Sequence, residues 1–158
     1  MSEPNSLEME IINSLKRELA TEFKGFEIKP SVYGKNRIFV NTTCKANKNA
    51  LKIMWEKFNA RVSTISGVDF GRTLGVVYHL ILDEYGINVN IKVNDVSKDN
   101  PELDSISDIV PAAEFMEREV HDLFGINFKG NPCMERWIIA DDWPEGKYPL
   151  RKDYKPGG

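Results

Sequence analysis

Three side chains that could exchange protons with a substrate stand close together in this sequence: Glu117, His121 and Asp122. Histidine titrates near neutral pH, and a carboxylate within hydrogen-bond reach can act as its partner in general acid–base catalysis. A small freestanding enzyme is therefore one hypothesis. Glu119 adds little to it, because residues two apart do not share a face of a helix. With no second histidine or cysteine at metal-ligand spacing, a surface or interface position fits His121 better.

The cysteine and glycine patterns predict no cofactor in this chain. Cys44 and Cys133 are its two cysteines, whereas an iron–sulfur cluster normally takes four thiolates and a structural zinc site four Cys or His ligands. We expect both to be free thiols in a reducing compartment. Gly67, Gly71 and Gly75 match no nucleotide-binding motif and are expected in a turn between strands.

Length and charge narrow the class of protein further. The chain has 158 residues, enough for one domain, and a net charge of −3, which argues against nucleic-acid binding. It shows no signal peptide and no apolar run long enough to span a membrane. We expect a soluble cytoplasmic protein whose link to a membrane comes only through partners.

Hydrophobic periodicity predicts three helices and five strands. The expected helices are Ser6 to Gly25, Asn47 to Phe58 and Pro111 to Phe124. The expected strands are Phe26 to Tyr33, Arg37 to Thr43, Ala60 to Ser66, Leu74 to Leu82 and Ile87 to Asn94. Ser6 and Asn47 are expected as helix caps, Gly34-Lys35-Asn36 as a hairpin turn, and Trp55 as a core residue.

This order of elements predicts an α+β domain with two layers, a mixed sheet packed on helices, over residues 1–128. The first strand is expected to be an edge strand or an interrupted one because it contains Pro30. Residues 97–107 are predicted to form a loop. Residues 129–158 show no helical or alternating period and are predicted to form an extended tail. The tail is too aromatic for a disordered segment. It either folds back over its own domain or binds a neighbour.

The third helix carries two stripes. Ala113, Met116, Val120 and Leu123 form an apolar stripe expected to be buried. Glu114, Arg118 and Asp122 form a charged stripe, in which the arginine has an acid four residues away on each side. Taken alone, this stripe is typical of a solvated ladder of ion pairs worth about 0.2–0.5 kcal/mol each.

Two motifs resemble the 30 kDa subunit family of respiratory complex I, which has counterparts in energy-converting nickel–iron hydrogenases and in archaeal relatives of complex I. The first is Glu117-Arg118-Glu119-Val120-His121-Asp122-Leu123-Phe124-Gly125-Ile126. The second comprises Asp142-Trp143-Pro144-Glu145-Gly146 and Tyr148-Pro149-Leu150-Arg151-Lys152-Asp153-Tyr154. Where the family usually has His-Pro, this chain has Asn131-Pro132, which indicates a divergent branch. The compact length favours an archaeal or hydrogenase-type relative.

The resemblance implies a non-catalytic structural subunit of the peripheral arm of a membrane-bound, ion-translocating oxidoreductase. The electron donor would be NADH, a reduced deazaflavin or hydrogen. The partners implied are a hydrogenase-like large subunit of the 49 kDa type and a cluster-bearing small subunit. Iron–sulfur clusters, with nickel–iron or flavin centres where present, would belong to those partners, and the chain would lie on the cytoplasmic side of the cell membrane. An unrelated monomeric adaptor is the remaining alternative.

The resemblance also favours an assembly surface, or a polar clamp that holds the tail, over the solvated ladder. The implied interface residues lie on the third helix and along the tail. They are Glu117, Arg118, Glu119, Asp122, Phe124, Arg136, Asp142, Trp143, Tyr148, Leu150, Arg151, Lys152, Asp153 and Tyr154. Arg151 could offer a bidentate fork to a carboxylate of another chain, with Trp143 and Tyr154 as rigid anchors.

Overall fold

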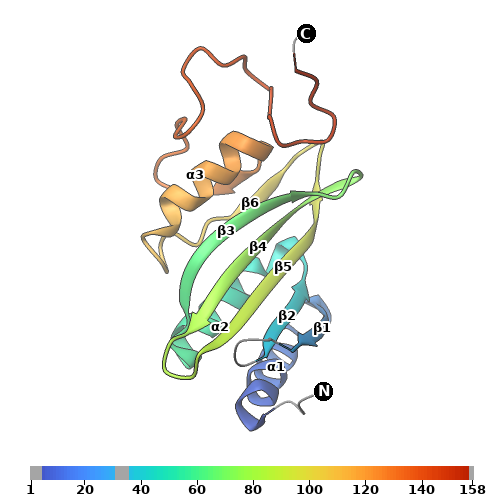
Figure 1. The fold of residues 1–158 in the computed structure, drawn as a ribbon, viewed down its shortest axis with the longest axis vertical. Coiled ribbons are helices and arrows are strands. Elements are labelled where there is room, and N and C mark those ends of the chain that lie inside the picture. Colours follow the sequence, from blue (N-terminus) through green and yellow to red (C-terminus); the bar gives the residue numbers. More distant parts are fainter. Residues whose placement is uncertain (1–4, 31–35, 157–158) are drawn as a thin grey trace.

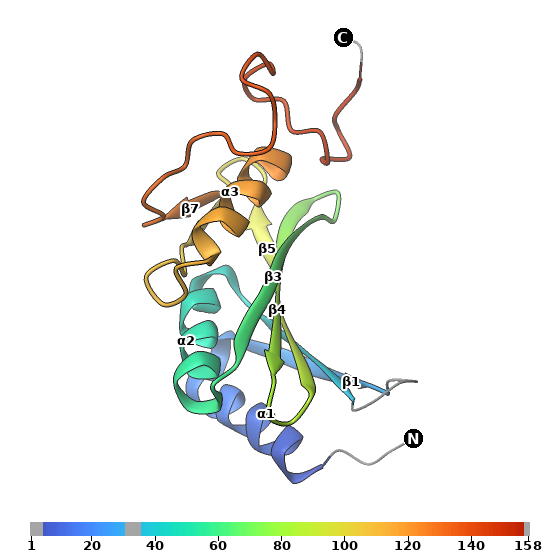
Figure 2. The same ribbon diagram turned by 60° about the vertical axis from the view of Figure 1, so that its left-hand side comes forward.

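A mixed five-stranded sheet covered on one face by two helices forms the body of the molecule. The computed structural model describes residues 5–30 and 36–156. Helices α1 (Ser6–Leu19) and α2 (Asn47–Phe58) pack against each other on the same side of the sheet (Figures 1 and 2). This arrangement confirms the predicted two-layer α+β fold.

The strands lie in the order β1-β2-β5-β4-β3 across the sheet. Their bounds are β1 (Phe23–Lys29), β2 (Arg37–Thr42), β3 (Arg61–Asp69), β4 (Thr73–Leu82) and β5 (Ile87–Ser97). β2 and β5 are parallel, and the other neighbours are antiparallel. The predicted alternation places the apolar residues of β5 in the core, and β1 lies at an edge as expected.

The first helix begins with a different cap from the predicted Ser6. Asn5 is the N-cap, and its side chain accepts a hydrogen bond from the Glu8 amide at 2.8 Å. The Glu8 carboxylate in turn accepts one from the Asn5 amide at 3.0 Å. This reciprocal pair is a capping box, and it moves the cap one residue towards the N-terminus.

The same helix also ends before the predicted stop at Gly25. Its last residue is Leu19, and a short 3-10 turn leads into β1, where Phe23 is paired with Thr42 of β2. Strand pairing therefore overrides the helical period at Phe23. Gly34 and Lys35 of the predicted hairpin turn lie outside the described residues.

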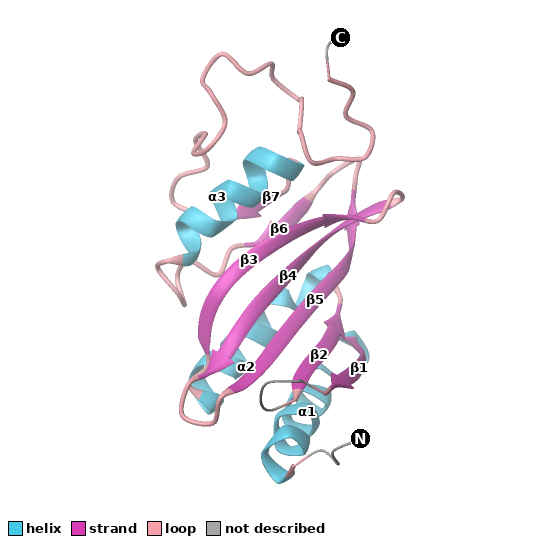
Figure 3. Ribbon diagram, viewed as in Figure 1, coloured by secondary structure: helices cyan, strands magenta, loops and turns pink. Residues whose placement is uncertain are grey.

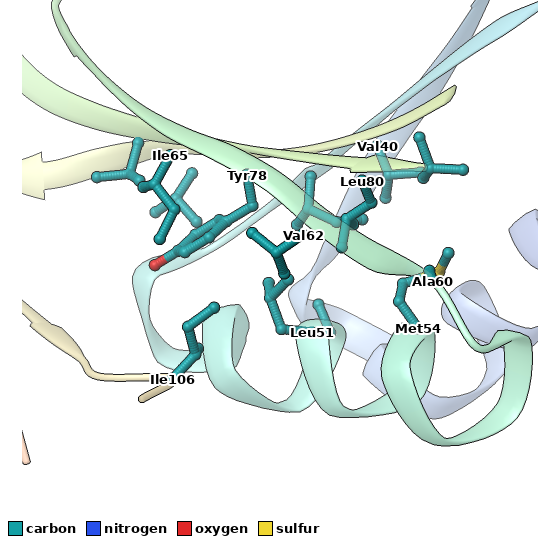
Figure 4. Packing of buried hydrophobic residues seen from close by; sticks show 14 of the residues in the cluster. Val40, Leu51, Met54, Ala60, Val62, Ile65, Tyr78, Leu80 and Ile106 are labelled. Atoms are coloured by element: carbon teal, nitrogen blue, oxygen red, sulfur yellow. The ribbon is translucent and has the colours of Figure 1, made fainter. Parts of the chain in front are cut away.

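Two predictions for α2 are wrong. Asn47 does not cap the helix, because its buried side chain donates to Tyr78 Oη at 3.0 Å and to the Asp104 carbonyl at 2.8 Å. Tyr78 lies in the core among the residues shown in Figure 4. Trp55 is 40% exposed rather than core, since the preceding residue, Met54, faces the sheet and successive helical positions point in different directions.

Residues 97–107, predicted as a loop, contain a further short strand. β6 (Glu102–Asp104) pairs in parallel with β7 (Asn127–Lys129) in a separate two-stranded sheet beside the third helix (Figure 3). Each strand has three residues, too few for an alternating pattern to be visible. Leu103 and Phe128 are both buried in the core cluster. The predicted division after residue 128 falls inside β7.

Helix α3 (Ala113–Phe124) packs on β3 where the strand has a glycine. Of the three glycines predicted in a turn, only Gly71 lies between β3 and β4, and the prediction is wrong for Gly67 and Gly75, which lie within the strands. A Cβ on Gly67 would stand 2.3 Å from Cδ2 of the Phe124 ring. The missing side chain lets α3 approach the sheet.

We expect Gly67→Ala to lower the free energy of unfolding by about 1–3 kcal/mol, because the added methyl group overlaps the Phe124 ring and forces α3 away from β3. Ser63→Ala, at an exposed position of the same strand, is the matched control. Chemical denaturation of the purified chain measures both. Equal stability of Gly67→Ala and the wild type would contradict the close packing.

Candidate functional site

α3 buries charged residues as well as apolar ones. The exposed fraction is 0% for Glu117, 8% for Arg118 and 2% for Asp122. The apolar stripe packs toward the core as predicted, Met116 and Leu123 being half-buried; it comprises Ala113, Met116, Val120 and Leu123. The charged residues meet residues 130–156, called the tail below, which run without helix or strand past α3 (Figure 3). The solvated-ladder interpretation is therefore wrong.

Asp122 binds the tail through backbone amides. Its Oδ2 atom accepts hydrogen bonds from the N–H groups of Trp137 at 2.8 Å, Ile138 at 2.7 Å and Ile139 at 3.3 Å. A carboxylate that accepts several backbone N–H groups is a strong, charge-assisted anchor. One side chain thus fixes three successive residues of a segment without secondary structure.

Arg118 binds the preceding residues of the tail through backbone carbonyls. Its Nε donates to the Glu135 carbonyl at 3.0 Å, and its Nη2 donates to the Arg136 carbonyl at 3.1 Å. The guanidinium also lies 4.8 Å from the centroid of the Trp137 ring and 5.8 Å from that of Phe115. Aromatic faces attract cations, so the rings cover the charge while the fork holds the backbone. Arg118 and Asp122 together form what we call the backbone clamp.

Glu117 joins the start of the tail to the loop that precedes α3. Its carboxylate accepts from Ser105 Oγ at 2.6 Å, from the Ile106 amide at 2.8 Å and from Asn131 Nδ2 at 2.8 Å. Burial raises the pKa of Glu117, although these hydrogen bonds act in the opposite direction. Asn131 Nδ2 also donates to the Glu114 carbonyl at 3.1 Å. Asn131 thus supplies a third donor to Glu117 and ties the start of the tail to α3.

The second half of the tail returns to the end of α3. Tyr148 lies against Gly125, where a Cβ would stand 2.4 Å from its ring, and the backbone φ of 70° there also favours glycine. Arg151 Nε donates to the Phe124 carbonyl at 2.6 Å, and its guanidinium lies 4.5 Å from the Tyr148 ring centroid. The amide of Leu150 donates to the Leu123 carbonyl at 3.2 Å. Arg151 therefore binds its own chain in this structure.

Asp69, at the end of β3, anchors the tail to the sheet. It accepts from the Lys152 amide at 2.8 Å, the Gly71 amide at 2.7 Å and Lys98 Nζ at 2.8 Å. Burial alone would raise the pKa of this carboxyl, but the hydrogen bonds from Lys98 and the two amides outweigh it and lower the pKa to about 2. The sequence patterns did not single out Asp69, because two of its three partners, Lys98 and Lys152, are distant in the chain.

The other residues implied as interface lie at the surface or within the tail. Glu119, Asp142, Lys152 and Asp153 are exposed. Arg136 Nη1 donates to the carbonyls of Ala140 at 3.0 Å and Asp141 at 2.6 Å. Trp143 stacks on Tyr154 with ring centroids 6.0 Å apart. None of these groups is buried in the core of the domain.

The geometry does not assemble the acid–base group of the enzyme hypothesis. Glu117 is fully buried, and one oxygen of Asp122 is occupied by the tail amides. His121 Nδ1 lies 3.0 Å from the Ile126 carbonyl oxygen. Among residues 5–30 and 36–156, no three His, Cys, Asp or Glu side chains gather as a metal ion would require. Nor does any helix of the described part combine the length and hydrophobicity needed to cross a membrane.

Comparison with known proteins decides the family. Residues 40–158 match the family described as "Respiratory-chain NADH dehydrogenase, 30 Kd subunit". The chain belongs to this family. The resemblance inferred from the two motifs is thereby confirmed, and the backbone clamp and the tail both fall within the matched region.

Relatives of two kinds share this 30 kDa subunit domain. The C/D subunit of the NADH-quinone oxidoreductase of Phocaeicola vulgatus is 42% identical over 111 residues, which cover 70% of this chain. The match covers 21% of that relative, so this chain spans only a small part of its length. The beta subunit of the membrane-bound hydrogenase of Pyrococcus furiosus is 35% identical over 132 residues, covering 81% of this chain and 76% of that one.

A solved structure shares the fold over nearly the whole chain. It is a chain from the membrane-bound sulfane sulfur reductase, an archaeal respiratory membrane complex. The two superpose with a TM-score of 0.75 at 33% identity, covering 94% of this chain and 85% of that one. The likeness therefore extends to the N-terminal elements that the family match does not cover.

We expect Arg118→Lys to loosen the tail although it keeps the charge. An ammonium group cannot donate to two carbonyls in a fixed geometry while lying against two rings, as the planar guanidinium does. We expect the free energy of unfolding to fall by about 1–3 kcal/mol. Exposed Arg17→Lys is the control. Faster proteolytic cleavage near residues 135–139, with the control unchanged, is the expected result; identical cleavage would show that the clamp does not hold the tail.

Asp69→Asn should lower the free energy of unfolding near neutral pH by about 1–2 kcal/mol, and this difference between variant and wild type should depend on pH. The folded pKa of about 2 lies below the ordinary value of 3.8. The ionised carboxylate therefore stabilises the fold above 3.8, and that contribution is lost as the pH falls from 3.8 towards 2. Stability curves of the variant and of exposed Asp99→Asn test this. If the difference in unfolding free energy between Asp69→Asn and the wild type stays constant between pH 3.8 and pH 2, the lowered pKa of Asp69 is refuted.

Proposed function

We propose that this chain is a non-catalytic structural subunit of the peripheral arm of a membrane-bound, ion-translocating oxidoreductase of the complex I type. It would dock on the hydrogenase-like large subunit, close to the cluster-bearing small subunit, on the cytoplasmic side of the membrane. The membrane link and the iron–sulfur clusters would belong to those partners. Membership of the 30 kDa subunit family and the names of the relatives support this proposal.

The observation that carries the docking proposal is a set of large apolar side chains that are exposed on a fixed backbone. Four residues of α3 and the tail are each about half exposed: Phe115, Trp137, Ile138 and Leu150. The amides of the last three all donate to α3, those of Trp137 and Ile138 to Asp122 and that of Leu150 to Leu123. Their backbone positions are therefore set before a partner arrives, which lowers the entropic cost of binding.

The chemistry of these exposed groups fits a protein partner. The Phe115 and Trp137 ring centroids are 4.9 Å apart, and both rings cover the Arg118 guanidinium. Interface cores are enriched in Trp, Tyr and Arg, and a few such residues usually carry most of the binding energy. The electron donor stays open, because the relatives are named for two kinds of complex, NADH-quinone oxidoreductase and membrane-bound hydrogenase.

Leu150→Ser provides the sharpest test, because it removes an exposed apolar group while leaving the backbone hydrogen bond to Leu123 in place. We expect co-purification with the hydrogenase-like large subunit, co-expressed from the same genome, to weaken about tenfold, as for the loss of an interface anchor. The stability of the isolated chain should change little, since the side chain is 53% exposed.

Tyr85→Ser is the matched control. Tyr85 is also a large exposed residue, at 44%, but it lies in the turn between β4 and β5, at the opposite end of the sheet from the tail (Figure 1). Its replacement should leave co-purification unchanged. If Leu150→Ser assembles as well as the control, the tail surface is not the docking site.

A further inference from the structure

The Arg151 guanidinium uses only part of its hydrogen-bonding capacity within this chain. Its Nε donates to the Phe124 carbonyl at 2.6 Å, and its Cζ lies 4.5 Å from the centroid of the Tyr148 ring. The two Nη nitrogens make no hydrogen bond to any residue that the structure describes, and neither of them is buried. A guanidinium carries five N–H donors in a fixed planar arrangement. The remaining donors are therefore open to a group from outside, in an orientation that Phe124 and Tyr148 have already set.

The same side chain lines a hollow in the surface of the tail. The volume of this hollow is about 390 Å³, and Arg151 lines it together with Lys147 and Lys155. Both lysines are exposed, and neither forms an ion pair within the described part of the chain. Asp153 also lines the hollow, and its carboxylate lies 4.0 Å from Lys98 Nζ. Three cations thus face one carboxylate, which already has a cation beside it, in a chain whose net charge is −3.

We propose that this hollow receives an aspartate or glutamate side chain of the partner subunit, whose carboxylate pairs with the Nη nitrogens of Arg151. Lys147 and Lys155 supply further positive charge at the same hollow. The inference rests on the proposed docking function and deepens it by naming the chemical group that the partner supplies. The site is continuous with the apolar docking surface, because Leu150, 53% exposed, is the residue next to Arg151.

A carboxylate from a protein fits this site better than a free phosphate does. The N–H groups of a guanidinium can donate side by side to the two oxygens of one carboxylate. Phosphate sites are often built from helix N-termini or from successive backbone N–H groups, and none of the residues that line this hollow lies in a helix. The Nη nitrogens also keep some contact with solvent, so the pair avoids the full desolvation cost of a buried ion pair.

Charge reversal at the two lysines tests the proposal without touching the contacts that hold the tail. The side chains of Lys147 and Lys155 make no hydrogen bond within the described residues, so Lys147→Glu and Lys155→Glu should fold as the wild type does. We expect each to lower the affinity for the co-expressed large subunit about tenfold at low salt and less at high salt. Lys16→Glu is the control, at an exposed position of α1 at the other end of the molecule (Figure 1), and should bind within about twofold of the wild type.

Arg151→Lys separates pairing with a carboxylate from a merely structural role. Lysine keeps the charge and can still donate to the Phe124 carbonyl, but it cannot present two N–H groups side by side in a fixed plane. We expect the affinity to fall about tenfold, while the Leu150 amide, which donates to the Leu123 carbonyl, stays protected from hydrogen exchange. If this amide loses protection in the variant that loses binding, Arg151 acts only by holding the tail, and the inference is overturned.

Cross-linking of the wild-type complex with a carbodiimide identifies the occupant directly. The reagent joins a carboxylate to a lysine amine that touches it, and mass spectrometry should find Lys147 or Lys155 linked to an aspartate or glutamate of the large subunit. Links from these lysines only to carboxylates of this chain would overturn the proposal. Saturable binding of inorganic phosphate by the isolated chain, abolished by Lys155→Glu, would assign the hollow to a free anion and also overturn it.

The binding measurements distinguish a failure of this inference from a failure of the proposed function. If the wild-type chain does not bind the large subunit at all, the proposed function is wrong and the inference falls with it. If the wild type binds and the variants at Lys147, Arg151 and Lys155 bind equally well, the inference alone is wrong.

Discussion

The structure depends on hydrogen bonds to the backbone of the tail. The tail has no strand beside it, so its N–H and C=O groups must find other partners. Buried N–H and C=O groups must be hydrogen-bonded. In residues 135–139 the partners come from one helix, where Arg118 takes two carbonyls and Asp122 takes three amides. The two side chains are four residues apart and so lie on the same face of α3. Two oppositely charged side chains on one helix face thus provide the backbone hydrogen bonds that a neighbouring strand would otherwise provide.

The burial of α3 follows from this arrangement. Charged side chains are rarely buried unless they are paired, and here backbone dipoles take the role of counter-ions. Glu117 is also stabilised by hydrogen bonds rather than by a counter-ion. At the start of the tail its carboxylate accepts from the Ile106 amide and from the Asn131 side chain. The helix is therefore covered on two sides, by the sheet through Phe124 over Gly67 and by the tail through the charged stripe.

The sequence predicted the elements with long periodic patterns and failed where distant partners decide the outcome. The alternation of β5 and the α3 period were sufficient to place both elements. Phe23 left its helix because it pairs with Thr42, and β6 and β7 were too short to show a pattern. The clamp residues were found through the family motif, but their partners are backbone groups, which carry no signature in the sequence. Asp69 was missed for the same reason, since its tail contact is with the Lys152 amide.

Anchoring through the backbone has a consequence for binding. When a helix holds the amides and carbonyls of a segment, the side chains of that segment are left to face outward, as Trp137 and Ile138 do. A strand in a sheet would turn alternate side chains towards the core, and a disordered tail would have to be ordered on binding at a cost in entropy. In the clamped tail the side chains are not turned towards a core, and the backbone is already ordered. Aromatic and aliphatic groups therefore stay exposed on a rigid support. An exposed apolar surface held rigidly in this way is typical of a protein interface, and in the docking role proposed above the position of the tail would be a condition for recognition.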